Sequence, residues 1–350
     1  MIVGLDVGNG SIGLFVKDGT AIVVESYPSV YGALDPNQTM ISFAKEGTEK
    51  PLDVFTFSQR EYVLGYENVR QARTAPIGAY DREQRFKSQE YQTLTKLTLL
   101  DAVTRTGKLG VVEIELSLGT PAEDYSEASI ALLQSWFKEP VVGAKNGQQI
   151  VVMVKAIHVI SQPIAVLMDV YLNDEGFVRQ GSLEHQKVLV LDAGSGTLDI
   201  SIFDSLVLVK QYSEPVGLND VYQSIIESIQ KEDPKIRVDA FDLEAQLRAQ
   251  DGKDVRFYEY GPRQIDITAY YHRAMKYTWE QLIAAVRRRC PDRSVYHIAI
   301  LAGGSGDAWK KEFLEWMPSL VLSVDPQKAV ARGLGKYTVA QSKQEVGATS

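Results

Sequence analysis

The chain has 350 residues, of which 45% are hydrophobic and 23% charged, with a net charge of −8 at pH 7 and one cysteine, Cys290. The length predicts two domains, the single cysteine excludes an intrachain disulfide and a cysteine-based metal cage, and the acidic balance argues against tight direct binding to nucleic acid. No apolar run reaches the ~18 residues of a membrane span, and no basic segment precedes the apolar N-terminus, so we expect a cytoplasmic protein without membrane attachment.

The first thirty residues predict a meander of three strands. The strands are expected at Ile2–Val7, Ile12–Lys17 and Ala21–Glu25. The first strand carries Asp6 near its end and is followed by Gly8, Asn9 and Gly10, and Asp18-Gly19 is a hairpin signal before the third strand. The polar turn after Asp6 is therefore the first candidate site.

Residues 28–78 lose this regularity, because Pro, Gly, Asn and Thr interrupt the pattern. Only Val54–Phe57 and Glu61–Leu64 are typical of strands there, and we interpret the stretch as an inserted, partly irregular subdomain. Helices and strands alternate again afterwards. They are expected at Ser88–Thr106 (helix), Val111–Leu118 (strand), a helix to about Lys138, Gln149–Val159 (strand) and Ile164–Tyr171 (helix).

A second meander begins at Val188, and its turn repeats the first. Asp192-Ala193-Gly194-Ser195-Gly196 has the same pattern as Asp6-Val7-Gly8-Asn9-Gly10, 192 − 6 = 186 positions later. Glycines let backbone N–H groups approach an anion, and the Asp can hold a metal or a water beside it. One such turn alone leaves a structural hairpin as the alternative, but two copies that start matching meanders predict a duplicated unit whose turns face each other across a cleft.

The remainder of the chain continues the alternation. Helices are expected at Val221–Gln230, Asp239–Ala249 and Arg263–Arg289, strands at Val255–Tyr260, Ser294–Leu301 and Leu320–Val324, and a last helix from Asp325. The strand to Leu301 ends in Ala302-Gly303-Gly304-Ser305-Gly306, and Arg287–Arg289 fit a solvated helix C-terminus. This order of elements predicts an α/β fold.

Five segments in a fixed order make the chain similar to the actin, heat-shock-chaperone and sugar-kinase superfamily. They are two phosphate loops (Asp6–Ser11, Asp192–Asp199), two connecting segments (Ile160–Ala165, Asp325–Gly335) and an adenosine loop (Leu301–Gly306). Within it the chain resembles the plasmid-segregation (ParM/StbA) actins and archaeal actin-like ATPases. That narrower resemblance rests on Glu61–Gly65, Tyr80-Asp81-Arg82 and Leu118–Pro121.

The resemblance implies a duplicated actin-like (RNase H-like) α/β fold with two domains around a nucleotide cleft. Domain I is expected at 1–161, with the insertion at about 28–85 and completion by a C-terminal helix at about 326–345; domain II is expected at 162–325. It also implies the binding of ATP, with GTP left open, and of Mg²⁺.

The implied site residues come from five places in the chain. Nucleotide contacts are expected from Asp6, Gly8, Asn9, Gly10, Gly194, Ser195, Gly196, Thr197, Gly217, Asn219, Gly303, Gly304 and Ser305. Asp6 and Asp192 are expected to hold Mg²⁺ mainly through water. Gln162 is expected to orient the attacking water, since an amide is no strong base, and Asp192 to accept its proton; a role in the helix alone is the alternative for Gln162.

The sequence departs from its relatives at one position. Many relatives carry Lys seven residues after the first Asp, where this chain has Gly13; Lys17 is the candidate replacement, with a side chain pointing elsewhere along the strand as the alternative.

The function implied is nucleotide hydrolysis coupled to polymerisation of the chain into filaments that move plasmid DNA through a small DNA-binding adaptor. The alternative is a sugar or other small-molecule kinase of the same superfamily, which would need an acceptor site. A chaperone would need a substrate-binding β-domain after residue 340, and a membrane-tethered scaffold an amphipathic tail; neither is expected here.

Overall fold

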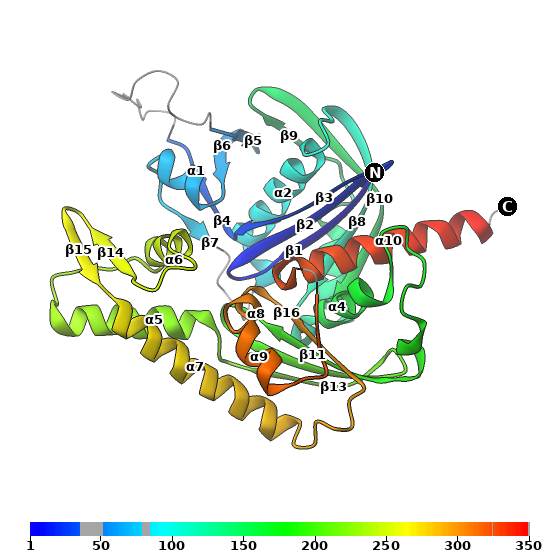
Figure 1. Cartoon of the computed structure of the whole chain (residues 1–350). Coiled ribbons are helices and arrows are strands. Elements are labelled where there is room, and N and C mark those ends of the chain that lie inside the picture. Colours follow the sequence, from blue (N-terminus) through cyan, green and yellow to red (C-terminus); the bar gives the residue numbers. More distant parts are fainter. Residues whose placement is uncertain (36–51, 79–84, 324, 349–350) are drawn as a thin grey trace. The chain divides into compact units, whose positions relative to one another are not determined.

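A computed structural model describes residues 1–35, 52–78, 85–323 and 325–348 (Figure 1). The chain forms two compact units, Met1–Ser182 with Ser323–Ser350, and Leu183–Leu322. The first unit thus extends past the domain boundary expected at residue 161, because helix α4 (Gln162–Tyr171) packs along the C-terminal helix α10 (Ala329–Ala348). The expected Tyr80-Asp81-Arg82 segment lies outside the described residues.

The first unit is built on a ten-stranded sheet in the order β3-β2-β1-β8-β10-β9-β5-β6-β4-β7. Its strands are β1 (Ile2–Val7), β2 (Ser11–Asp18), β3 (Ala21–Pro28), β4 (Val30–Ala33), β5 (Val54–Phe57), β6 (Arg60–Leu64), β7 (Ile77–Gly78), β8 (Gly110–Thr120), β9 (Val141–Lys145) and β10 (Gln148–Ser161). The first meander is confirmed as β1, β2 and β3, and β1, β8 and β10 run parallel.

The insertion is more regular than the sequence suggested. The short helix α1 (Tyr66–Gln71) contacts β4 and β6, and the strands β4, β5, β6 and β7 pair with one another. Because β5 also pairs with β9, the described part of the insertion continues the sheet. These strands are two to five residues long, which is too short for a clear periodic signal.

Helices cover both faces of this sheet. They are α2 (Gln89–Thr104), α3 (Glu127–Ser135), α4, α10 and 3-10 turns at Arg85–Lys87, Ala122–Asp124 and Pro326–Lys328. Side chains alternate along β1, so Val3, Leu5 and Val7 join the core with α2. Gly4 points to the opposite face, where an added Cβ would lie 2.9 Å from the backbone of Gly335 in α10. Asp6 shares the face of Gly4.

The second unit contains a five-stranded sheet in the order β13-β12-β11-β16-β17 and a separate β14–β15 hairpin. Its strands are β11 (Lys187–Ala193), β12 (Leu198–Asp204), β13 (Val207–Glu214), β14 (Phe257–Tyr260), β15 (Arg263–Asp266), β16 (Ile298–Ala302) and β17 (Leu320–Leu322). Its helices are α5 (Leu218–Glu232), α6 (Ala240–Ala249), α7 (Thr268–Arg289), α8 (Gly304–Ala308) and α9 (Lys310–Trp316), and the 3-10 turn Gly181–His185 leads into it.

The two units repeat one strand plan. In each, an antiparallel meander (β3-β2-β1 or β13-β12-β11) is followed by two parallel strands (β8-β10 or β16-β17). The register also repeats, since Asp6 pairs with Gly13 and Asp192 pairs with Asp199, seven positions later in both cases. The α/β fold and the duplication are therefore confirmed.

Some boundaries differ from expectation. The long helix α7 begins at Thr268, not Arg263, because Arg263–Asp266 pairs with β14 as a hairpin strand around Gly261, whose φ is +59°. The last helix begins as a 3-10 turn and runs to Ala348. Among the described residues, no helix is both long and apolar enough to cross a membrane.

Candidate functional site

The first half of the candidate site is the turn between β1 and β2. The amide N–H of Gly8 donates to the carbonyl of Ser11 at 3.0 Å, and the carbonyl of Gly10 accepts from the N–H of Ser29 at 3.2 Å. The hydroxyl of Tyr91, on α2, donates to the carbonyl of Val7 at 3.1 Å. These bonds hold the ends of the turn, and Gly8, Asn9 and Gly10 stay partly exposed.

Asp6 and Gln162 meet in the first unit, although they are 156 positions apart. The Nε2 of Gln162, the first residue of α4, donates to the Oδ1 of Asp6 at 2.7 Å. Burial raises the pKa of Asp6 to about 6, although the bond from Gln162 and the charge of Arg85 act in the opposite direction. The structure thus brings these two predicted site residues into direct contact.

Close packing and polar groups surround this carboxylate. A Cβ added to Gly119 would lie 3.2 Å from the Oδ1 of Asp6 and 3.3 Å from Leu334, so glycine allows the backbone to approach the carboxylate closely. Thr120 follows Gly119, and Ser161 precedes Gln162. Both hydroxyls are buried without a hydrogen-bond partner among the described residues, and such groups usually bind water or a ligand.

The second half of the candidate site is the turn between β11 and β12. The N–H of Gly194 donates to the carbonyl of Thr197 at 2.8 Å, and the hydroxyl of Thr197 lies 3.4 Å from Oδ2 of Asp199. Asp192 is buried and is flanked in register by Asp199 on β12 and by Ala302 on β16. Asp192 thus occupies the position in its meander that Asp6 occupies in the meander of the first unit.

Two further loops pack on this second turn. The N–H of Asn219 donates to the carbonyl of Ser195 at 2.8 Å, and the hydroxyl of Ser305 donates to the carbonyl of Gly194 at 2.6 Å. A Cβ on Gly217 would lie 2.4 Å from the carbonyl oxygen of Ser195, so the loops approach closer than any side chain would allow.

Gly303 is the tightest position of the second unit's site. Its φ is +86°, which side chains rarely tolerate, and an added Cβ would lie 2.2 Å from the carbonyl oxygen of Ala193 and 2.5 Å from Oδ1 of Asp192. The backbone after β16 therefore lies directly against the carboxylate that was predicted to hold the metal.

The predicted residues therefore assemble into two groups, one in each unit. The first unit brings together Asp6, Gly8, Asn9, Gly10 and Gln162. The second brings together Asp192, Gly194, Ser195, Gly196, Thr197, Gly217, Asn219, Gly303, Gly304 and Ser305.

A cation at either carboxylate would need water among its ligands. Within the described residues, no cluster of three or more His, Cys, Asp or Glu side chains is arranged to hold a metal. Asp6 and Asp192 are hard oxygen donors beside glycine-rich turns, and this donor type suits Mg²⁺, which keeps several waters when it binds.

Two side chains differ from the sequence interpretation. Lys17 does not replace the missing lysine at position 13, because its Nζ donates to the carbonyl of Asp174 at 2.6 Å. Arg85 was missed altogether, yet its Nη2 donates to the Oδ1 of Asn9 at 2.8 Å. The two residues are 76 positions apart, and no local motif marks Arg85.

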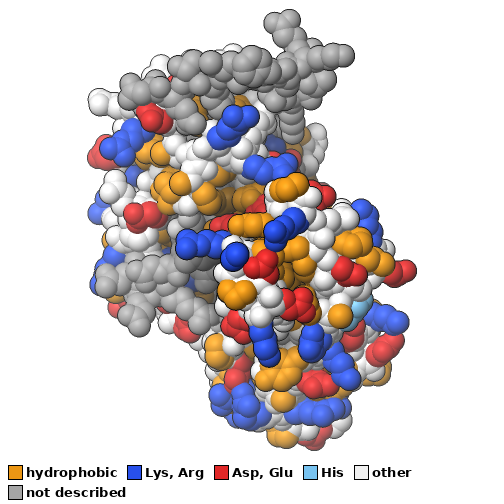
Figure 2. All heavy atoms as spheres, turned by 90° about the vertical axis from the view of Figure 1, so that its left-hand side faces the viewer, with side chains coloured by type: hydrophobic (Ala, Val, Ile, Leu, Met, Phe, Trp, Pro, Cys, Tyr) orange, Lys and Arg blue, Asp and Glu red, His pale blue; other side chains and the backbone are white. Residues whose placement is uncertain are grey.

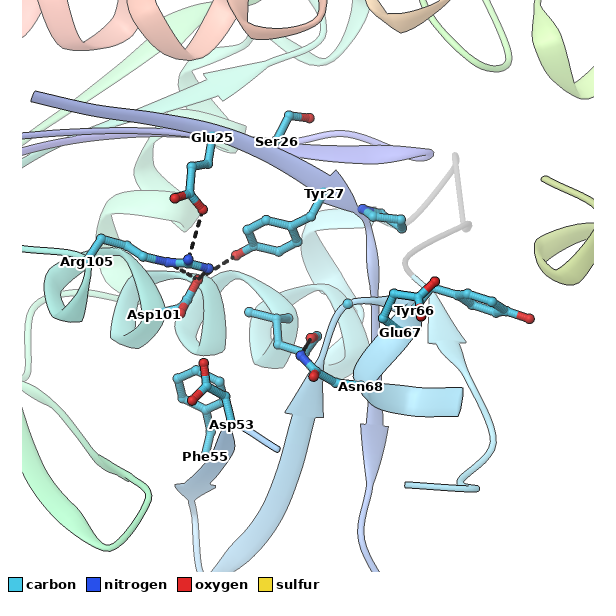
Figure 3. Close-up of a pocket in the computed structure, with 13 residues that line it drawn as sticks. Glu25, Ser26, Tyr27, Asp53, Phe55, Tyr66, Glu67, Asn68, Asp101 and Arg105 are labelled. Carbon is cyan, nitrogen blue, oxygen red and sulfur yellow. Dashed lines mark hydrogen bonds and ion pairs between the residues drawn. The ribbon is translucent and has the colours of Figure 1, made fainter. Parts of the chain in front are cut away.

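A cavity of about 220 Å³ lies elsewhere in the first unit (Figure 3). Its lining comes from β3, β5, β6, α1, α2 and adjacent residues, and it shares no residue with the candidate site. Asp101 accepts hydrogen bonds there from Tyr27, Arg105 and Lys145, and Arg105 also pairs with Glu25 at 2.9 Å. The central charges are thus compensated by protein groups.

The chain was compared with protein-family models and with known proteins. Residues 4–164 match the family model described as actin like proteins N terminal domain. This stretch of the chain therefore resembles an actin-like domain. No curated protein matches the chain by sequence.

Solved structures extend the likeness over both units. The archaeal actin homologue Ta0583 in complex with ADP is 15% identical, with a TM-score of 0.71 over 98% of this chain and 99% of that one. ParM of Bacillus thuringiensis with ATP is 16% identical, with a TM-score of 0.66 over 98% of each chain. A 15-stranded ParM filament from Clostridium botulinum is 16% identical, with a TM-score of 0.73 over 96% of this chain and 98% of that one. At these identities the likeness concerns the fold.

Proposed function

We propose that this actin-like chain binds and hydrolyses ATP and polymerises into filaments. The observation that carries the proposal is the repeated turn, in which an acidic residue at the end of a strand is followed by a glycine-rich reversal at the same register in both units. Support comes from structural neighbours that carry ADP or ATP and from one that is a filament.

The glycine-rich turns are the proposed phosphate contacts. Backbone N–H groups of Gly8, Asn9 and Gly10 bind one side of the phosphate chain, and those of Gly194 to Thr197 bind it from the second unit's turn. The adenosine lies against Gly303, Gly304 and Ser305, with Gly217 and Asn219 at the purine. GTP remains a second candidate because none of these backbone contacts reads the base.

Asp6 and Asp192 hold Mg²⁺ in this proposal, largely through water. The metal supplies neutralisation of the charge that develops on the phosphoryl oxygens. Gln162 uses its Nε2 to fix Asp6, and its amide oxygen then accepts a hydrogen bond from the attacking water. Asp192 accepts the proton of that water, because a carboxylate is the stronger base of the two.

The proposed biological role is the movement of plasmid DNA inside the cytoplasm. Subunits that contact each other head to tail build an open filament, and the bound nucleotide changes the stability of those contacts. A small adaptor with centromere-like DNA is the expected second partner, since an acidic chain is poorly suited to bind DNA itself.

The decisive experiment is sedimentation of the purified chain with ATP, GTP, ADP or no nucleotide, with phosphate release measured in the same samples. We expect pelleting and phosphate release with ATP and neither without nucleotide. A chain that stays in the supernatant under all four conditions, and that phosphorylates an added sugar, would instead be the kinase. The compensated charges and separate location of the 220 Å³ cavity make it a poor acceptor site for that alternative.

A further inference from the structure

Arg85 lies buried beside the turn of the first unit. Its residue is 6% exposed, and it opens the 3-10 turn Arg85–Lys87 that precedes α2. Its Nη2 donates to the Oδ1 of Asn9 at 2.8 Å, and its guanidinium lies 6.0 Å from the centre of the Tyr91 ring. One side of the guanidinium is thus attached to the glycine-rich turn.

The charge of Arg85 is only partly compensated within the described structure. Its one hydrogen bond there goes to a neutral amide oxygen, and its Nε is buried without a partner. No carboxylate of the described residues forms an ion pair with it, although it acts electrostatically on Asp6 and Asp124. A buried cation with an unused N–H is costly, so an anion is the expected missing partner.

The chemistry of the missing partner follows from the location. A guanidinium binds two oxygens of a phosphate at once, and the adjacent Gly8–Gly10 turn offers backbone N–H groups to the same kind of ligand. No lysine stands at position 13, which is glycine, and the one cation suggested as its replacement, Lys17, donates to the carbonyl of Asp174 instead.

We infer that Arg85 binds the phosphate chain of the nucleotide and is the side-chain cation of the first unit's phosphate turn. This inference rests on the proposed nucleotide binding. The competing explanation is that Arg85 only positions Asn9, in the way that Tyr91 fixes Val7 from α2.

The test is nucleotide binding by Arg85→Met and Arg85→Lys, measured calorimetrically for ATP and ADP and by competition for AMP. Methionine keeps the length without charge, and lysine keeps the charge without the planar fork. We expect Arg85→Met to weaken ATP and ADP binding by about 10- to 100-fold, the value of a charge-assisted hydrogen bond, with AMP changed by less than about threefold. Arg85→Lys should lie between Arg85→Met and the unchanged chain.

Lys87→Met is the matched control, because Lys87 is an exposed cation on the same 3-10 turn; its affinities should equal those of the unchanged chain. Thermal unfolding without nucleotide establishes that each variant folds. Should Arg85→Met fail to fold, Arg85→Lys decides the question, and equal ATP affinity in that variant and the unchanged chain overturns the inference.

A double-mutant cycle with Asn9→Ala separates contact from positioning. If Arg85 binds phosphate itself, Arg85→Met still lowers the affinity for ATP when Asn9→Ala is already present. If Arg85 only positions Asn9, Arg85→Met has no further effect on ATP affinity in the Asn9→Ala variant, and the inference is wrong. An equal loss for AMP, or ATP affinity within about twofold of the unchanged chain, would also overturn it. If the unchanged chain binds none of the nucleotides, the proposed function fails first.

Discussion

Asp192 is the residue on which the proposed chemistry most depends. It is buried at the end of β11, with Asp199 and Ala302 as its register neighbours and the backbone of Gly303 against its side chain. Because a positioned base contributes about 10²- to 10⁴-fold to proton transfer, we expect Asp192→Asn to lower the rate of ATP hydrolysis by at least about 10²-fold. A phosphate-release assay measures this.

The control for Asp192→Asn is Asp204→Asn. Asp204 ends the same hairpin, and its carboxylate makes exposed contacts with Lys187 at 3.9 Å and with the hydroxyl of Ser205 at 3.2 Å, so its neutralisation should leave hydrolysis unchanged. If Asp192→Asn hydrolyses ATP at the full rate, Asp192 is not the general base.

Gly303 permits a prediction about stability. Gly303→Ala combines an unfavourable positive φ with a clash against the carbonyl of Ala193, whereas Gly252 has a φ of +74° and nothing within 4 Å of an added Cβ. The positive φ lowers the free energy of unfolding by about 1–2 kcal/mol in each alanine variant. The clash lowers it by about 1–3 kcal/mol more in Gly303→Ala alone. Chemical denaturation should therefore show a larger loss for Gly303→Ala than for Gly252→Ala. Equal losses of stability in the two variants would mean that the loop after β16 can move to relieve the clash at no measurable cost in free energy.

At the scale of elements, α4 and α10 are joined by a buried charge cluster. Asp169 of α4 accepts from Arg332 at 2.9 Å and from Lys336 at 2.9 Å, and its side chain is 4% exposed. Asp169→Asn would leave two cations without their carboxylate, which typically costs about 3–5 kcal/mol. Glu67→Gln, in the exposed pair with Arg70, should change the free energy of unfolding by less than about 1 kcal/mol.

The same cluster predicts a pH dependence. Burial acts to raise the pKa of Asp169, but the bonds and charges of Arg332 and Lys336 outweigh it and hold that pKa below its ordinary value of 3.8. The unfolded chain therefore takes up this proton first as the pH falls, so the stabilisation is fully present above about pH 4 and is lost at lower pH. Denaturation of the unchanged chain and Asp169→Asn should differ near neutral pH and converge below pH 3.8. A constant difference would contradict this assignment.

The sequence predicted elements well where the signal was local. Both meanders are confirmed. Asn146-Gly147 is likewise a local turn signal, and it closes the β9–β10 hairpin with φ of +51° and +77° at the two residues. Helix α4 begins directly after Ser161, two residues before the predicted start at Ile164, and the hydroxyl of Ser161 makes no capping bond. Gly261-Pro262 was a usable turn signal before α7 that the helical spacing outweighed.

Contacts between distant segments were the part that local patterns could not supply. Arg85 and Asn9 are joined across 76 positions, and Asp169 and Lys336 across 167. The pairing of β5 with β9 likewise links the insertion to a hairpin far along the chain. The bond from Gln162 to Asp6 was not predicted, although the family resemblance had named both as site residues.

At the scale of the whole molecule, the duplication explains why the turns after Asp6 and Asp192, each a weak motif alone, together predicted the fold. The same strand order and the same seven-residue offset recur in both sheets. The copies differ opposite the acidic residue, where the first has Gly13 and the second Asp199. Gly13 adds no charge beside Asp6, so the copies have comparable backbones but different electrostatics.

The distribution of charge bears on whether the chain touches DNA. The net charge is −8, and Figure 2 shows Lys and Arg interspersed with Asp and Glu over the face it presents. The densest basic run is Arg287–Arg289 at the end of α7. Two of its members are already engaged, since Arg288 and Arg289 donate to Glu214 at 2.5 and 2.7 Å, which keeps the pKa of that carboxyl low.

We therefore expect no saturable binding of the isolated chain to duplex DNA at about 150 mM salt, because non-specific affinity depends on free cations that replace counterions. Fluorescence anisotropy of a labelled duplex, titrated at about 20 and 150 mM salt, measures this. Glu214→Gln is the informative variant: it releases Arg288 and Arg289, so it should strengthen binding at low salt while leaving the high-salt result unchanged. Micromolar binding by the unchanged chain at 150 mM salt would contradict the prediction, and the filament would then hold its DNA without an adaptor.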